Sequence, residues 1–272
     1  MHLKRWLTAI IAVPVLIYLV GFGSRWILYL LFYLVSMAGL YEFYRLVSPG
    51  LPKGIQGAGY LLTFLLFLVI YGGQILFALI IISFLAIIPM TLSLFTPSSN
   101  SRDKTADIGK ALMGPVYIGL PLAMLLPIDR FYLIHYHIKG IWIFFLLAVT
   151  FANDTGAFYI GKIFGKHKLY ESVSPNKTWE GAVGGLVSGV IVGLLFLFVF
   201  RYHPVNPTVI GLIVALCIAG QIGDLSESML KRDRGAKDSG KILPGHGGIL
   251  DRIDSILFSV PILYLFLLLS IP

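Results

Sequence analysis

The chain has 272 residues, of which 57% are apolar and only 12% are charged, and its mean hydropathy is +0.88. An ordinary soluble domain carries about a quarter charged residues, so this composition excludes that class. The formal net charge is +8, and the single cysteine, Cys217, excludes a disulfide framework or a cysteine-rich zinc cluster. We therefore expect an all-α, polytopic integral membrane protein.

Apolar runs of about 20 residues predict nine transmembrane helices. They lie near residues 6–22, 26–47, 56–72, 74–95, 111–128, 140–160, 181–200, 208–227 and 249–271. Residues 1–110 carry little chemistry and are interpreted as N-terminal scaffold helices. Residues 111–272 are interpreted as a transmembrane catalytic region with two cytoplasmic basic loops, 161–180 and 228–248.

The distribution of lysine and arginine predicts the orientation of these helices. With a cytoplasmic N-terminus, 17 of the 21 basic residues fall on the cytoplasmic side and four on the other. This asymmetry favours an odd number of spans and a C-terminus outside. We expect a multi-pass protein of the inner cell membrane, with both basic loops and the active site facing the cytoplasm.

Polar residues within the predicted spans are few. Glu42 and Arg45 are one helical turn apart, so we expect them to pair with each other or with the membrane interface. Asp154 lies within the sixth span, where an acid is costly and usually functional. The seventh span has glycines at four-residue intervals, which allow close approach of a helix from the same chain or from a second protomer. The glycines are Gly181, Gly185, Gly189 and Gly193.

The stretch from 221 to 255 combines acids and bases between two apolar runs. Asp224 and Glu227 are three residues apart, as are Asp251 and Asp254, so each pair lies on one face of a helix. When two acidic faces meet, a hard divalent cation relieves the repulsion between them. The intervening bases and the flexible PGHGG sequence (244–248) suit phosphate oxygens. The simpler interpretation, a solvated loop that only orients two spans, leaves the carboxylates unexplained.

The polar positions of this stretch resemble the signature of the phosphatidate cytidylyltransferases, also called CDP-diacylglycerol synthases. The matching residues are Ser228, Lys231, Arg232, Lys237, Asp238, Pro244, Gly245, His246, Gly247, Gly248, Asp251, Arg252, Ile253 and Asp254. The segment SPNKTWEG (174–181) is similar to a second basic motif of that family, with Asn176 where lysine is more common. Together the two motifs cover a small part of the chain.

The resemblance implies transfer of the cytidylyl group of CTP to phosphatidic acid, giving CDP-diacylglycerol and pyrophosphate. The lipid phosphate is already an anion, so metal ions and basic side chains are sufficient for this chemistry. We expect Mg²⁺ as cofactor, with a second cation left open, and metal ligands Asp224, Asp251 and Asp154. Catalytic roles are expected for Asp224, Asp251, Lys231, Arg232 and Asp254. Substrate binding is expected for Lys177, Ser228, Lys237, Asp238, His246, Gly247, Gly248 and Arg252.

The expected partners are CTP, phosphatidic acid and the lipid bilayer, with a homodimer as a further option and no nucleic acid. Three alternatives stay open: a CTP-dependent enzyme acting on another lipid phosphate, one acting on a polyprenol, and an anion transporter. A transporter often has inverted repeats with broken helices in both halves, whereas charge is concentrated here in the second half. A CDP-alcohol phosphotransferase is disfavoured because the chain has no Asp-Gly dipeptide.

Overall fold

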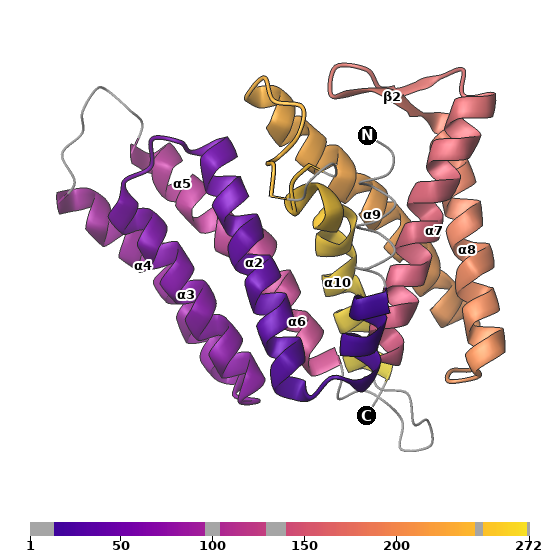
Figure 1. The fold of residues 1–272 in the computed structure, drawn as a ribbon, viewed down its shortest axis with the longest axis horizontal. Helices are drawn as coiled ribbons and strands as arrows, with labels where there is room; N and C mark the ends of the chain where they lie inside the picture. The colour runs from indigo at the N-terminus through magenta and orange to yellow at the C-terminus, as the bar shows by residue number, and fades with distance from the viewer. Residues whose placement is uncertain (1–13, 96–103, 129–139, 243–246, 271–272) are drawn as a thin grey trace. The chain divides into compact units, whose positions relative to one another are not determined.

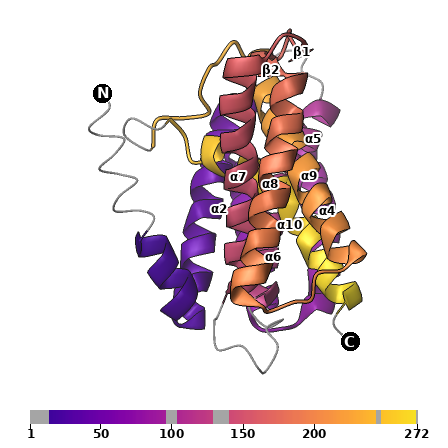
Figure 2. The same cartoon turned by 90° about the vertical axis from the view of Figure 1, so that its right-hand side faces the viewer.

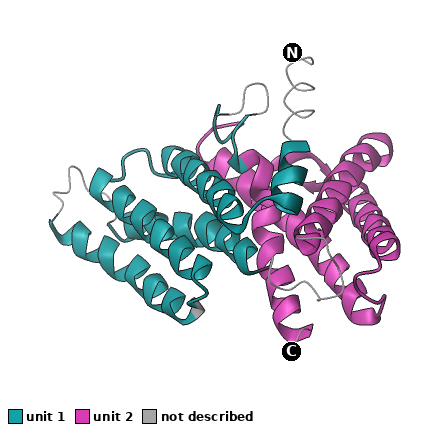
Figure 3. Ribbon diagram, turned by 60° about the horizontal axis from the view of Figure 1, so that its bottom comes forward, with its two compact units in different colours: residues 1–127, 238–250 teal, residues 128–237, 251–272 magenta. Residues whose placement is uncertain are grey.

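The computed structural model describes residues 14–95, 104–128, 140–242 and 247–270. The chain forms two compact units, which are coloured separately in Figure 3. The first unit comprises residues 1–127 together with 238–250, and the second comprises 128–237 together with 251–272. The short segment 238–250 therefore belongs to the N-terminal unit, although it lies inside the predicted catalytic region.

Eight helices in the described part of the chain are long and apolar enough to cross a membrane. The prediction of a polytopic helical membrane protein is thus confirmed. The first predicted span, 6–22, lies partly outside the described residues, and residues 14–22 are helical. Helices suit this composition because their backbone hydrogen bonds are satisfied within each segment, which a bilayer requires.

Besides the helical residues 14–22, three helices and one composite span make up the described part of residues 1–127 in the first unit. They are α2 (Arg25–Val47), α3 (Lys53–Tyr71), α4 (Ile75–Phe95), and the run α5 (Lys104–Gly114), η1 (Pro115–Gly119) and α6 (Leu120–Ile128). The η1 segment is a π-helical turn that begins at Pro115, whose missing N–H removes one helical hydrogen bond. The buried Tyr44 of α2 donates its hydroxyl to the Ala111 carbonyl of α5 at 2.9 Å, which ties this span to α2.

Four helices and a small hairpin form the second unit (Figures 1 and 2). They are α7 (Ile141–Phe164), β1 (Lys168–Tyr170), β2 (Ser174–Thr178), α8 (Trp179–Phe200), α9 (Pro207–Asp233) and α10 (Leu250–Ser270). Two helices begin at side-chain caps: Thr178 accepts from the Gly181 N–H at 3.1 Å, and Asn206 accepts from the Val209 N–H at 2.9 Å. These caps fix where α8 and α9 start.

The glycines of α8 serve packing within the chain. Helices α7 and α8 lie side by side along their length (Figure 2). A Cβ atom at Gly185 would lie 2.6 Å from the Asn153 carbonyl oxygen of α7, and one at Gly189 would overlap the Cys217 sulfur of α9. Glycine is therefore required for this close approach. Because internal helices cover these positions, the stripe does not by itself indicate a homodimer, which stays a prediction.

Both segments predicted as basic loops contain regular secondary structure. Within 161–180, α7 continues to Phe164 and is followed by the β1–β2 hairpin, in which Lys168 pairs with Thr178 and Tyr170 with Ser174. The Glu180 carboxylate of α8 accepts from the backbone N–H groups of Lys166 and His167, so it holds the entry to the hairpin. The extended strands bring the second half of this segment back to α7.

Within 228–248, helix α9 continues to Asp233, so Ser228, Lys231 and Arg232 are helical rather than in a loop. The prediction of a loop from 228 was wrong because it equated the end of the apolar run with the end of the helix. Polar residues mark where the chain leaves the lipid, but a helix can continue beyond that point. Here the helix ends only near Gly235, which has a φ of 63°.

A pair of glycine substitutions tests this packing. Gly185→Val places side-chain atoms where α7 already lies, so we expect the free energy of unfolding to fall by about 1–3 kcal/mol. Gly211→Ala on α9 is the matched control, because a Cβ there meets nothing within 4 Å. It should be neutral or stabilising by up to about 1 kcal/mol. Equilibrium unfolding of the purified protein in mixed micelles measures both, and equal stability of the two variants would contradict the packing described.

Candidate active site

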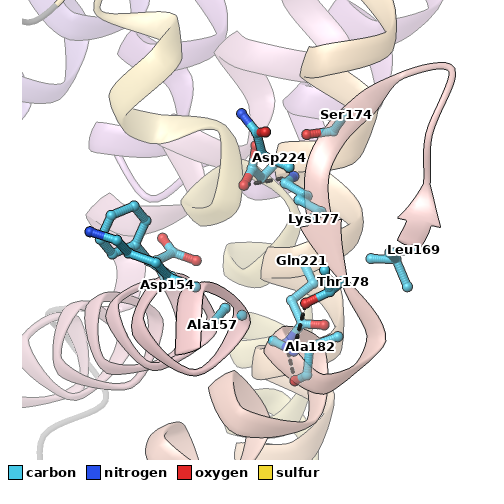
Figure 4. A pocket seen from close by; sticks show the side chains of 14 residues that line it. Asp154, Ala157, Leu169, Ser174, Lys177, Thr178, Ala182, Gln221 and Asp224 are labelled. Atoms are coloured by element: carbon cyan, nitrogen blue, oxygen red, sulfur yellow. Dashed lines mark hydrogen bonds and ion pairs between the residues drawn. The ribbon is translucent and has the colours of Figure 1, made fainter. Parts of the chain in front are cut away.

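A cavity of about 500 Å³ lies in the second unit, between the β1–β2 hairpin and helices α7, α8 and α9 (Figure 4). Its walls come from the C-terminal half of α7, strand β2, the first turn of α8 and the middle of α9. Small-molecule sites commonly measure roughly 300–1,000 Å³, so the cavity is large enough for a ligand. Its polar side chains are Asp154, Lys162, Ser174, Asn176, Lys177, Thr178, Gln221 and Asp224.

An ion pair between Lys177 and Asp224 spans one side of this cavity (Figure 4). The Lys177 Nζ and Asp224 Oδ2 atoms are 2.8 Å apart, and the side chains are 26% and 37% exposed. The contact is an ion pair rather than a hydrogen bond, and the Lys177 Nζ atom itself is buried. Strand β2 carries Lys177 to the cavity directly before α8 begins, and α9 supplies the carboxylate. Two residues 47 positions apart in the printed sequence are thereby brought together.

Asp154 on α7 lines the same cavity, and its functional role stays a prediction. Its Oδ2 atom accepts a hydrogen bond from the Ser255 hydroxyl of α10 at 3.3 Å. It lies close enough to Asp224 for the two negative charges to repel each other. The buried Asp254 of α10 is also near both. Three acids from three helices thus share one region, with Lys177 as a compensating cation.

Two amide side chains link the helices around this region. The Gln221 Nε2 atom of α9 donates to the Asn153 Oδ1 atom of α7 and to the Ala182 carbonyl of α8, both at 2.9 Å. Asn153 is fully buried and also lies 3.4 Å from the Cys217 carbonyl of α9. The sequence analysis did not select Gln221. The available signal was a polar amide in an apolar run, three residues before Asp224 and on the same helical face.

A second charged cluster is buried between α9 and α10. The Lys231 Nζ atom contacts Glu227 Oε2 at 2.6 Å and Asp251 Oδ1 at 2.7 Å. The side chains of Glu227, Lys231 and Asp251 are 0%, 12% and 10% exposed. The two predicted acidic faces therefore do meet, and an ammonium group lies between them. Lys231 was expected to bind phosphate from a loop, whereas here it neutralises two buried carboxylates.

The remaining predicted site residues have varied positions. Arg232 is exposed near the end of α9, and its Nε atom donates to the Val173 carbonyl of the hairpin at 3.3 Å. Ser228 is half-buried on α9. Lys237, Asp238 and Arg252 are exposed. Gly247 has a φ of 83°, a conformation that favours glycine, and His246 lies outside the described residues.

The arrangement of carboxylates bears on the expected metal site. Among the described residues, no group of three or more His, Cys, Asp and Glu side chains forms a ready-made metal site. Asp224 and Asp251 contact different lysines, so the shared site expected for this pair stays a prediction. The donor chemistry suits Mg²⁺, because Asp154 and Asp224 offer carboxylate oxygens in an accessible cavity. Lys177 supplies the positive charge next to these oxygens.

Comparison with known proteins matches residues 3–270 to the family described as the cytidylyltransferase family. The chain is 35% identical over 267 residues to a phosphatidate cytidylyltransferase of Staphylococcus haemolyticus, covering 97% of this chain and 98% of the relative. It is 41% identical over 175 residues to the protein of that name from Staphylococcus saprophyticus, and 41% identical over 176 residues to one from Staphylococcus aureus. These two matches cover 64% and 65% of the relatives' lengths.

The buried cluster leads to a stability prediction. Lys231→Met leaves Glu227 and Asp251 without their compensating cation, so we expect the free energy of unfolding to fall by about 3–5 kcal/mol. Lys237→Met is the matched control, because Lys237 is exposed, and it should change stability by less than about 0.5 kcal/mol. Equilibrium unfolding in mixed micelles measures both. Equal stabilities would mean that the cluster does not depend on Lys231.

Proposed function

The chain belongs to the cytidylyltransferase family, and we propose that it transfers the cytidylyl group of CTP to phosphatidic acid, producing CDP-diacylglycerol and pyrophosphate. The observation that supports this function is a ligand-sized cavity that presents Lys177, Asp224 and Asp154 together, in a protein with many apolar helices. The names of the relatives support the same substrates. Such a site suits a reaction between a water-soluble polyanion and an anionic lipid.

The proposed reaction needs no activated protein nucleophile. A phosphate oxygen of phosphatidic acid attacks the α-phosphorus of CTP, a new phosphorus–oxygen bond forms, and the bond to the β-phosphate breaks to release pyrophosphate. The protein must bring two anions together and stabilise the charge that develops on the leaving group. Basic groups at the cavity serve this purpose, since charge-assisted hydrogen bonds to phosphate are strong. Lys177 and Lys162 line the cavity and are the nearest candidates.

The Lys177–Asp224 pair provides a simple route to phosphate binding. The Lys177 ammonium group is buried beside the carboxylate, and it would turn from the carboxylate to a phosphate oxygen that enters the cavity, which both side chains line. The first turn of α8 also lines the cavity, and the positive end of the helix dipole favours an anion there. Asn153 and Gln221 hold α7, α8 and α9 in register, so they keep these groups facing one another.

We also propose Mg²⁺ as the cofactor. Asp154 and Asp224 would hold the ion, which would supply positive charge to the departing pyrophosphate. The carboxylate released by Lys177 would then retain a cationic partner. Asp254 lies near both acids and would add negative charge to the same region.

The location follows from the proposed substrates and from charge. Phosphatidic acid resides in the bilayer, and the excess of basic residues on one side of the predicted spans favours a cytoplasmic site, where CTP is available. We propose the inner cell membrane as the location. A homodimer stays a prediction, because the small-residue stripe of α8 is occupied by internal contacts.

Two positions of an isotopic label distinguish the proposed reaction from its alternatives. With purified protein, Mg²⁺ and phosphatidic acid in mixed micelles, label at the α-phosphorus of CTP should enter the lipid, and label at the γ-phosphorus should appear in pyrophosphate. Label from the γ-phosphorus entering a polyprenol would identify a kinase. Activity only with a different lipid phosphate would replace the substrate. If purified protein transfers neither label and instead carries an anion across vesicles, the proposed function is wrong.

The proposed activity should depend on the Asp224 carboxylate. Asp224→Asn keeps the shape of the side chain and removes its charge, so we expect kcat to fall by about a hundredfold or more, with partial recovery at higher Mg²⁺. The matched control is Asp233→Asn, because Asp233 lies on the same helix and its side chain is 75% exposed. The control should retain wild-type turnover. Wild-type activity and Mg²⁺ dependence in Asp224→Asn would contradict the proposed metal and phosphate site.

A further inference from the structure

A buried acid in the N-terminal unit contacts the motif segment 238–250. Glu42 lies on α2 and is 1% exposed. Glu42 was predicted to belong to the scaffold and to pair with Arg45 or with the membrane interface, but Arg45 is exposed and the described residues show no ion pair between the two. The carboxylate instead faces residues that lie about two hundred positions later in the chain.

The Glu42 Oε2 atom accepts two hydrogen bonds from this segment. The Ser239 hydroxyl donates at 3.2 Å, and the backbone N–H of Leu250 donates at 3.0 Å. Ser239 stands near the start of the segment and Leu250 at its end. One carboxylate oxygen therefore holds both ends of the segment together.

The bond to Leu250 has a particular role, because Leu250 is the first residue of α10. The first N–H groups of a helix have no partner within it and are usually satisfied by a preceding Ser, Thr, Asp or Asn. Here the preceding residue is Ile249, whose side chain cannot accept a hydrogen bond. Glu42 supplies this acceptor from another helix, and its negative charge suits the positive end of α10.

Two glycines allow the segment to reach the carboxylate. A Cβ atom at Gly240 would overlap the carboxylate of Glu42. A Cβ atom at Gly248 would overlap Ser239 Oγ and Glu42 Oε2, and it would lie 2.8 Å from the Gly240 nitrogen. The segment is therefore packed around Glu42 so closely that no side chain fits at either position. Gly248, predicted to bind substrate, has this packing role in addition.

We propose that Glu42 is a positioning residue for the cytidylyl-transfer reaction: it joins Ser239 to Leu250 and fixes the residue at which α10 begins. Asp251, Arg252 and Asp254 follow Leu250 immediately, so the start of the helix determines which face each of them occupies. This role rests on the proposed function. A buried carboxylate is costly, and packing alone would be served better by an apolar side chain.

Hydrogen exchange and kinetics together test this role. In Glu42→Ala the Leu250 amide loses its acceptor, so its exchange should accelerate by about tenfold or more, while amides in the middle of α3 and α8 keep their wild-type rates. The kcat for cytidylyl transfer should fall by about tenfold or more. Glu42→Gln retains an acceptor oxygen and should recover part of both properties. Gly248→Ala displaces the segment without altering Glu42, and it should reproduce the effects of Glu42→Ala.

The matched control is Ser36→Ala, because Ser36 is also buried on α2 and lies away from the motif segment in sequence. It should leave exchange at Leu250 and turnover unchanged. Wild-type exchange at Leu250 in both Glu42→Ala and Gly248→Ala would overturn the positioning role, whatever the activity. Faster exchange with unchanged kcat would also overturn it, because the segment would then be irrelevant to turnover. Absence of cytidylyl transfer in the wild type would overturn the proposed function instead, and the exchange rates would still report the contact.

Discussion

Compensation of buried negative charge is the constraint on which the second unit depends. A carboxylate removed from water requires a cation or several hydrogen-bond donors, and this requirement is severe among apolar helices. Lys231 meets it for the buried Glu227 and Asp251, and Lys177 forms an ion pair with the more exposed Asp224. The Lys231–Asp251 pair joins α9 to α10 and the Lys177–Asp224 pair joins the hairpin to α9, so charge compensation also contributes to how these elements are held together.

Lys231 and Lys177 differ in exposure and in the number of carboxylate partners. This difference favours a structural role for Lys231 and the proposed functional role for Lys177. Lys231 is 12% exposed and has two carboxylate partners, so its withdrawal would leave both without compensation. Lys177 has one partner in a cavity and is 26% exposed. In the proposed mechanism, an incoming phosphate replaces Asp224 as the partner of Lys177 at lower cost. Lys231 lies in the signature of residues 228–254 and Lys177 in the second motif, 174–181, and it is their surroundings that distinguish them.

Polar groups of the polypeptide backbone also need partners when they are removed from water. A nonhelical segment in a membrane protein needs partners for its polar groups that a helix would supply internally. Glu42 provides an acceptor for Ser239 and for the first N–H of α10. Glu180 does the same for Lys166 and His167 at the entry to the hairpin. In both motif regions an acid outside the irregular segment organises its backbone.

The amino-acid sequence by itself determined the class of protein and the approximate spans, and it predicted the acidic and basic residues of the candidate site. Hydropathy acts over about 20 consecutive residues, so apolar runs predict helices such as α8 well. It did not predict that α9 continues to Asp233 or that a hairpin follows α7, because helix ends depend on local hydrogen bonds and caps. Only the tertiary structure decided which charges meet. Lys177 and Asp224, or Glu42 and Leu250, are far apart along the chain, and their pairing depends on the packing of helices that no local pattern encodes.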